Sequence, residues 1–298
     1  MTAISGVVPI VPTPFVPGDE SVDTTALRGL VDFAVEAEAA SICLPAYGSE
    51  FYKLTEPERL EVVEVAVDQA GGRLPVMAQC NHGSAQGAAQ LARQNADIGA
   101  EVISFALPRQ FPLTDGDQFD YARAVCDAVS APVLIQDWNP SGSSVGAQFC
   151  AQLADVCPNF RYIKLEEPRM GPKVRAIIEA TGGRVEVFEG WGGLYMLELV
   201  PTGIVGIMPG LALTDRLAPA WRLAVDGQAA EALAAFEPLV PWLAFGLSDM
   251  EFFNALEKRL LVARGLLEHA TLRNPTVTID ADSLAYADFL IGQLLESA

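Results

Sequence analysis

Basic side chains are scarce in this sequence. Its 298 residues include 38 Asp and Glu but only 19 Lys and Arg, which gives a formal net charge of −19. A surface of this sign repels nucleic acid and anionic membranes, so we expect neither as a partner. A small anionic substrate can still bind where a local positive feature holds it.

Histidine and cysteine are also rare, and their spacing disfavours several kinds of site. The two histidines, His82 and His269, are far apart and lack clustered aspartates, so we predict no metal site. The five cysteines are odd in number and no pair has C-x-x-C spacing, which argues against a disulfide framework and a zinc knuckle. Reduced thiols are typical of the cytoplasm, where we expect the protein to reside.

Long apolar runs, targeting signals and nucleotide motifs are missing as well. No apolar run reaches the roughly 18 residues that suggest a membrane-spanning helix. The opening MTAISGVVPIVPTPF has no basic stretch followed by a long apolar one, so we predict no signal peptide. No G-x-G-x-x-G follows the first apolar run, which disfavours an open dinucleotide-binding sheet, and we expect no cofactor.

Short apolar runs are abundant instead, and segments with helical periodicity separate them. Strands buried on both faces read as short, nearly continuous apolar runs. Right-handed crossovers join such parallel strands, and eight β–α units in about 220 residues have the proportions of a closed barrel. The eight runs are residues 6–14, 41–46, 74–80, 101–107, 131–138, 160–166, 185–191 and 203–209, and helices are expected at 24–37, 55–70, 84–98 and 117–129.

The last part of the chain has helical patterns only, at residues 226–244, 251–267 and 280–296. We therefore predict an α/β fold, a (β/α)8 TIM barrel over residues 1–225. A C-terminal helical extension over residues 226–298 is expected to pack on the barrel. A doubly wound open sheet is the competing architecture.

Barrel enzymes place their chemistry at the C-terminal ends of the strands and in the loops that follow. This rule selects candidate residues from seven loops or strand ends. Those that we predict to bind substrate are Tyr47, Gly48, Ser49, Asn81, His82, Gln136, Trp191 and Met208, and those that we predict to be catalytic are Lys164 and Glu166. Considered by itself, His82 is more simply interpreted as a loop residue that makes hydrogen bonds.

Lys164 and Glu166 end the sixth run, FRYIKLE. Side chains alternate along a strand, so these two point the same way and Glu167 points the other way. Burial favours the neutral form of a lysine, and a neutral amine attacks a ketone to form a Schiff base. A carboxylate about 6 to 7 Å along the strand is placed to move a proton on the neighbouring carbon. A solubilising pair at a strand end is the alternative, and the strand alone does not decide.

The whole chain resembles the dihydrodipicolinate synthase and N-acetylneuraminate lyase family of class I aldolases, from GVVPIVPTPF through FRYIKLEEP to GIVGIMPG. The family pattern G-T-T-G-E-F-x-x-L-T-x-x-E-R is similar to AYGSEFYKLT at 46–55 with Glu58 and Arg59. The resemblance implies that Lys164 is the Schiff-base lysine. It also implies a homotetramer, and a substrate carboxylate held near the 48–50 turn by backbone N–H groups.

Several positions depart from the family pattern. Gln136, in IQDWNP, stands where the family has a proton-shuttling tyrosine, and an amide does not exchange protons near neutral pH. The threonine pair becomes Tyr47 and Gly48, residues 141–144 contain no arginine, and the tyrosine after the fourth strand is replaced near Arg109 and Gln110. These changes disfavour both lysine synthesis and tyrosine-assisted cleavage.

The Lys-Leu-Glu sequence at 164–166 resembles the branch of the family that dehydrates L-2-keto-3-deoxyarabonate, in which a glutamate two residues after the lysine replaces the tyrosine. We therefore predict a Schiff-base-forming dehydratase of a 2-keto-3-deoxy sugar acid. A pyruvate-releasing aldolase and a non-catalytic ligand-binding barrel are the alternatives.

Overall fold

The computed structural model describes residues 3–109, 112–139 and 142–296. Gln110, Pro140 and Ser141, which belong to motifs discussed above, lie outside the described residues. No helix in these three ranges is long and apolar enough to cross a membrane.

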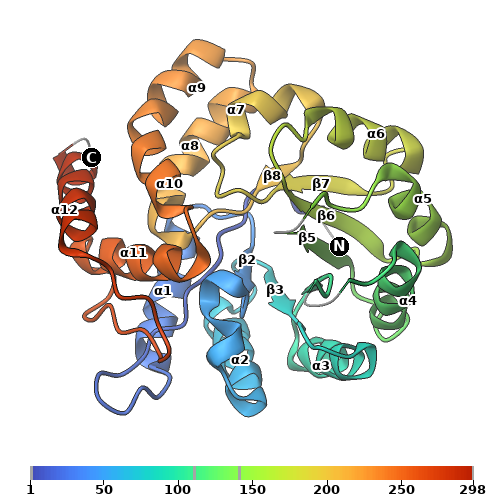
Figure 1. Ribbon diagram of the computed structural model, residues 1–298, viewed down its shortest axis with the longest axis horizontal. Helices are drawn as coiled ribbons and strands as arrows, with labels where there is room; N and C mark the ends of the chain where they lie inside the picture. The colour runs from blue at the N-terminus through green and yellow to red at the C-terminus, as the bar shows by residue number, and fades with distance from the viewer. Residues whose placement is uncertain (1–2, 110–111, 140–141, 297–298) are drawn as a thin grey trace.

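Eight parallel strands form a single sheet in the order β1-β8-β7-β6-β5-β4-β3-β2 (Figure 1). The strands are β1 (Gly6–Val7), β2 (Ile42–Leu44), β3 (Val76–Gln79), β4 (Val102–Ala106), β5 (Val133–Trp138), β6 (Phe160–Glu166), β7 (Glu186–Glu189) and β8 (Gly206–Ile207). The segment after β1 closes the sheet against β2, because the N–H of Cys43 donates to Pro9 and the N–H of Val11 donates to Cys43, both at 3.0 Å. The predicted (β/α)8 barrel is confirmed.

Helices follow the strands and ring the sheet in Figure 1. They are α1 (Thr24–Glu36), α2 (Glu56–Ala70), α3 (Ala85–Ile98), α4 (Asp115–Cys126), α5 (Ala147–Val156), α6 (Gly171–Thr181), α7 (Met196–Leu199) and α8 (Thr214–Val225). Local sequence fixes several of their ends. Thr55 and Glu58 form a capping box at the start of α2, and Gly71 ends this helix in the left-handed conformation with φ 53°.

The C-terminal part is helical, as predicted, but the expected helix at 226–244 is broken. It consists of α9 (Ala229–Phe236), a 3₁₀ turn (Glu237–Leu239) and α10 (Val240–Gly246). Pro238 and Pro241 cause the break, because proline lacks the N–H that a continuous helix would use. Two further helices, α11 (Met250–Ala263) and α12 (Ala281–Glu296), complete the chain on the same side of the barrel as α9 and α10 (Figure 1). The division into two units at residue 225 remains a prediction.

The interior of the barrel has an apolar floor. Residues from six strands meet there, among them Met77, Val102, Leu134, Tyr162 and Phe188. Because strand side chains alternate, the next inward positions toward the C-terminal ends are Gln79, Gln136 and Lys164, which are also buried. A polar layer therefore lies directly above the apolar floor, at the end of the barrel where the candidate residues were predicted.

Candidate active site

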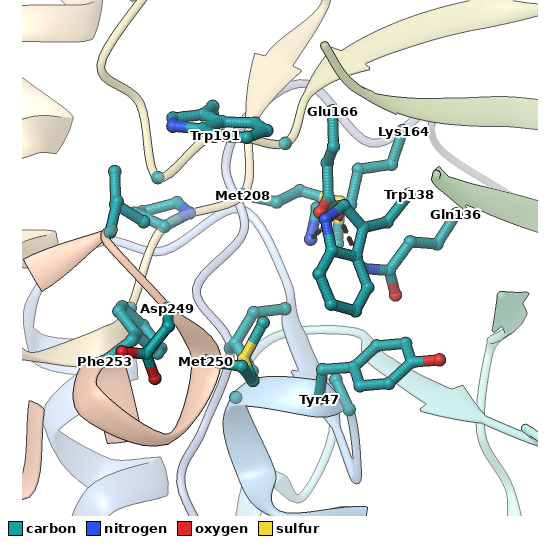
Figure 2. Close-up of a pocket in the computed structure, with 18 of the residues that line it drawn as sticks. Tyr47, Gln136, Trp138, Lys164, Glu166, Trp191, Met208, Asp249, Met250 and Phe253 are labelled. Carbon is teal, nitrogen blue, oxygen red and sulfur yellow. Dashed lines mark hydrogen bonds and ion pairs between the residues drawn. The ribbon is translucent and has the colours of Figure 1, made fainter. Parts of the chain in front are cut away.

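A cavity opens at the C-terminal end of the barrel (Figure 2). One side of its wall comes from the ends of β5 and β6, with Gln136, Trp138, Lys164 and Glu166. The remaining wall comes from loop residues 46–48, 190–192 and 208–210, and from residues 247–250 and Phe253 of the C-terminal extension.

Lys164 and Glu166 form the polar centre of this cavity. The Nζ atom of Lys164 lies 2.9 Å from Oε1 of Glu166, and each side chain is only 7% exposed. Nε2 of Gln136 donates a hydrogen bond of 2.6 Å to the same carboxylate oxygen. Figure 2 shows the three side chains converging from neighbouring strands. A buried amine, a carboxylate and an amide donor therefore meet at one point.

The strand register and one glycine explain this convergence. Gln136 of β5 is the register partner of Lys164 on β6, and Trp138 is the partner of Glu166. On the other side, Gly190 follows β7 directly. A Cβ atom at this position would lie 2.5 Å from Cγ of Glu166 and 2.8 Å from Cε of Lys164. Position 190 therefore has to be glycine for the lysine and the glutamate to lie where they do.

Glu167 points out of the barrel, as the alternation predicts. Its carboxylate accepts hydrogen bonds from the backbone N–H and hydroxyl of Ser144, at 2.8 and 2.7 Å, and forms an ion pair of 2.7 Å with Lys173. These contacts occupy Glu167 away from the cavity, so it serves as a natural control for Glu166.

The loop after β2 offers backbone donors to the cavity. The N–H groups of Ser49 and Glu50 donate to the carbonyls of Ala46 and Tyr47, at 2.9 and 3.0 Å. Within the described part of the chain, the N–H groups of Tyr47 and Gly48 have no such acceptor, and both residues line the cavity. Two adjacent free N–H groups are suited to hold a carboxylate. The carboxylate site expected near the 48–50 turn remains a prediction, and these two N–H groups are its candidate donors.

Aromatic rings border the cavity above this loop. The rings of Tyr47 and Trp138 meet edge to face, with their centroids 5.2 Å apart, and Trp191 lies on the opposite side in Figure 2. Burial, and then the charge of Glu166, raise the pKa of Tyr47 above its usual value near 10. The Tyr47 phenol therefore stays protonated at neutral pH and is a donor rather than a base.

Three residues predicted to bind substrate do not line the cavity. Ser49 is fully buried and its hydroxyl donates to the carbonyl of Val11 at 2.5 Å. His82 turns outward, where Nδ1 accepts from the N–H of Ser84 at 3.0 Å and supports the start of α3. Asn81 is buried behind the cavity, where its side chain contacts Gln79 rather than open space. The same cavity is lined by the other seven predicted residues, which are Tyr47, Gly48, Gln136, Lys164, Glu166, Trp191 and Met208.

Two sets of residues were missed by the sequence reasoning. Gln79 contacts Gln136 at 2.7 Å. Its signal was a polar residue inside the apolar run 74–80, on the same strand face as Asn81. The second set is residues 247–250 and Phe253, which reach the cavity from the segment between α10 and α11 and from the first turn of α11. Helical periodicity gave no reason to aim that segment at the barrel mouth.

The described residues contain no cluster of three or more His, Cys, Asp or Glu that could hold a metal ion.

Comparison with known proteins identifies the family. The Dihydrodipicolinate synthetase family matches residues 3–292. An L-2-keto-3-deoxyarabonate dehydratase from Azospirillum brasilense is 26% identical over 287 residues, which cover 94% of this chain and 91% of that one. A 4-hydroxy-tetrahydrodipicolinate synthase from Acidobacterium capsulatum is 27% identical over 286 residues, or 95% and 93% of the two chains.

Solved structures agree on the fold. The dihydrodipicolinate synthase of Aquifex aeolicus has a TM-score of 0.90 at 20% identity and covers 98% of both chains. A prophage protein of the same family from E. coli K12, solved in complex with pyruvate, has a TM-score of 0.88 at 21% identity and covers 99% of both chains. Since the family match extends over nearly the whole chain, this protein is a member of the Dihydrodipicolinate synthetase family and an enzyme of the lyase class.

Proposed function

We propose that the protein is a Schiff-base-forming dehydratase of a 2-keto-3-deoxy sugar acid. The observation that carries this proposal is the contact of Glu166 with both Lys164, at 2.9 Å, and Gln136, at 2.6 Å. An amide neither gains nor loses a proton near neutral pH. Of the two side chains Gln136 and Glu166, only Glu166 can therefore act as a base toward the substrate.

The first stage is imine formation. Lys164 loses a proton to water, and its neutral Nζ attacks the C2 carbonyl of the substrate. The resulting carbinolamine takes a proton back from water and loses its hydroxyl as water. The product is a protonated imine between Nζ and C2, with Glu166 a carboxylate.

The second stage removes the C4 hydroxyl. Glu166 takes a proton from C3, and the C–H electrons form the C2–C3 double bond of an enamine. The enamine electrons then return to form a C3–C4 double bond as the C4–O bond breaks, and protonated Glu166 gives its proton to the departing hydroxyl. Water hydrolyses the imine, so the net change is the loss of one water from the substrate.

Binding of the substrate carboxylate is explained by the loop after β2. The net charge of −19 repels an acid at long range. The free N–H groups of Tyr47 and Gly48, together with the Lys164 ammonium, supply the local positive field that binding requires. The carboxylate would then lie beside the ketone that Lys164 attacks.

Product analysis tests the reaction. The enzyme is incubated with 2-keto-3-deoxy pentonic and hexonic acids, and we expect a 2-keto product that has lost one water. Release of pyruvate and an aldehyde would instead assign the aldolase reaction, in which the C3–C4 bond breaks. If the acids bind but none of them gives either product, the result would favour the non-catalytic ligand-binding barrel.

Trapping tests the lysine. Borohydride with pyruvate should attach a reduced adduct to Lys164, seen by mass spectrometry of the intact protein and its peptides. Lys164→Ala should abolish the adduct, whereas Lys173→Ala, which alters a pair outside the cavity, should retain it. Lys258 is also buried, and burial lowers its pKa to about 8. An adduct on Lys258 would overturn the assignment.

A further inference from the structure

A chain of three buried amides leads to Glu166 from the opposite side of the barrel. The backbone N–H of Ala106 donates to Oδ1 of Asn81 at 2.6 Å, and Nδ2 of Asn81 donates to Oε1 of Gln79 at 2.7 Å. Nε2 of Gln79 donates to Oε1 of Gln136 at 2.7 Å, and Nε2 of Gln136 donates to Glu166 at 2.6 Å. Every link is therefore a short hydrogen bond between groups shielded from water.

The two ends of this chain decide its direction. A side-chain amide can be turned so that either its oxygen or its NH2 group faces a neighbour. A backbone N–H can only donate, so Ala106 requires the oxygen of Asn81. Each following amide must then present its oxygen to the previous residue and its NH2 group to the next. As a result Gln136 offers a donor, not an acceptor, to Glu166.

Small side chains on β4 make the chain possible. Gln79 on β3 and Gln136 on β5 are separated by β4, where Ser104 is the register partner of Gln79 and Ala106 is the partner of Gln136. Because these two side chains are short, the glutamines can meet across the strand. Nη2 of Arg59 also holds the backbone carbonyl of Asn81 at 2.6 Å, which fixes the start of the chain.

We propose that Gln79 and Asn81 are positioning residues, which act on Glu166 through Gln136. The inference rests on the proposed function, because it assigns Glu166 the transfer of the C3 proton. Neither Gln79 nor Asn81 lines the cavity. Their effect is to keep the Gln136 NH2 group on the carboxylate, which holds Glu166 in place beside Lys164.

Loss of the chain should affect one step selectively. Without a donor on its oxygen, the Gln136 amide is free to turn and place that oxygen against Glu166. Two acceptors then face each other, which displaces the carboxylate from its position beside Lys164. Imine formation at Lys164 continues, whereas removal of the C3 proton slows.

The first test uses Gln79→Met, which keeps the length of the side chain and removes the donor. Borohydride trapping with pyruvate reports imine formation, and exchange of pyruvate methyl protons in deuterated water reports proton transfer by Glu166. We expect trapping to stay within about twofold and exchange to fall by about 10-fold or more, the usual effect of losing a residue that supports an active-site ligand.

A second variant, Asn81→Asp, replaces one NH2 group by an oxygen. The amides of Gln79 and Gln136 must then both turn, so that the oxygen of Gln136 faces Glu166. Exchange should fall at least as far as in Gln79→Met. Trapping at Lys164 should stay close to wild type, whereas a role limited to folding would lower trapping and exchange together.

Two controls separate positioning from general damage. In a Gln136→Met background, adding Gln79→Met should cause no further loss of exchange, because residues that act through one group are not additive. Gln118→Met removes another buried amide, which donates to Pro108 outside the chain, and should leave exchange unchanged.

The outcomes distinguish the two proposals. Wild-type exchange in Gln79→Met, an equal loss of trapping and exchange, or additive losses with Gln136→Met would overturn the positioning role and leave the dehydratase proposal intact. Absence of both trapping and exchange in the wild-type enzyme would overturn the proposed function, and the positioning role with it.

Discussion

Two buried polar networks lie near the mouth of the barrel, and they are built differently. The first is the neutral chain of Asn81, Gln79 and Gln136, which ends on Glu166. The second consists of ion pairs centred on Glu50, whose carboxylate contacts Lys258 at 2.5 Å and Lys53 at 2.9 Å.

The charged network joins the loop after β2 to the C-terminal extension. Lys53 also contacts Glu251 of α11 at 2.7 Å, and Nζ of Lys258 donates to the carbonyl of Thr271 at 2.9 Å. Glu50 itself adopts the left-handed conformation, with φ 56°, in the turn that follows Tyr47 and Gly48. These contacts therefore fix the backbone that supplies the proposed carboxylate site.

The comparison shows two ways of using buried polarity. Amides impose a direction on a neighbouring group without adding a charge that would compete with Lys164 and Glu166. Ion pairs hold a backbone segment firmly, but each charge depends on its partner, because an unpaired buried charge is costly. We therefore expect damage to the amide chain to appear in a rate, and damage to the ion pairs to appear in stability and binding.

The largest effect is expected at the end of the amide chain. Glu166→Gln keeps the size of the side chain and removes the base, so dehydration and pyruvate exchange should fall by about 10² to 10⁴-fold, the usual contribution of a positioned acid or base. Borohydride trapping at Lys164 should persist. Glu167→Gln is the matched control and should be much milder. Exchange at the wild-type rate in Glu166→Gln would mean that Glu166 is not the base.

The ion-pair network should respond differently. Lys258→Met leaves Glu50 with one cation fewer in a buried site, and the free energy of unfolding should fall by about 3 kcal/mol. A higher pyruvate concentration should be needed for trapping, while exchange at saturation stays close to wild type. Urea unfolding and a trapping titration measure the two effects.

Two control variants accompany Lys258→Met: one removes a second charge, and the other breaks an exposed ion pair. Adding Glu50→Gln to Lys258→Met should recover part of the lost stability, because neither charge is then left alone. Arg28→Met breaks a pair whose side chains are 39% and 69% exposed, and should cost less than about 1 kcal/mol. Equal losses from the exposed and the buried pair would contradict the comparison.

A smaller, pH-dependent effect is expected at Glu257, the neighbour of Lys258 on α11. Burial raises its pKa to about 7, although its carboxylate accepts the N–H of Ala212 at 2.6 Å. Between the unfolded value near 4.5 and about 7, the folded protein keeps a proton that the unfolded chain has released. Its contribution to stability is therefore complete below pH 4.5 and is lost as the pH rises through 7.

Glu257→Gln removes this titration. The difference in unfolding free energy between pH 5 and pH 7.5 should shrink by roughly 2 kcal/mol relative to wild type. Urea unfolding at the two pH values measures it. Glu268→Gln, at a carboxylate that is 88% exposed, should leave the difference unchanged. An unaltered pH dependence in Glu257→Gln would mean that this carboxyl titrates normally in the folded protein.

Much of the fold, and the pairing of Lys164 with Glu166, followed from short-range patterns. Nearly continuous apolar runs mark strands buried on both faces, and alternation alone places residues 164 and 166 on one side. The break between α9 and α10 was visible in Pro238 and Pro241, but the helical period of the surrounding residues obscured it.

Other features depend on contacts between distant parts of the chain. Gln79 meets Gln136 because of the register of three strands and the small side chains on the middle one. The strand-end rule selects the end of the barrel at which the cavity opens, but it does not say which way a loop side chain turns. The rule therefore could not predict that Ser49 and His82 point away from the cavity.

The segment from Leu247 to Phe253 has a consequence for how relatives of this enzyme differ. The proposed reacting groups, Lys164 and Glu166, lie on β6, whereas this segment, distant in sequence, forms part of the facing wall. In the proposed reaction, substitutions there would alter which chain length or stereoisomer is accepted while the lysine and the glutamate stay in place. Reaction type and substrate preference could then evolve independently, because the Lys-x-Glu spacing does not determine which substrate fits.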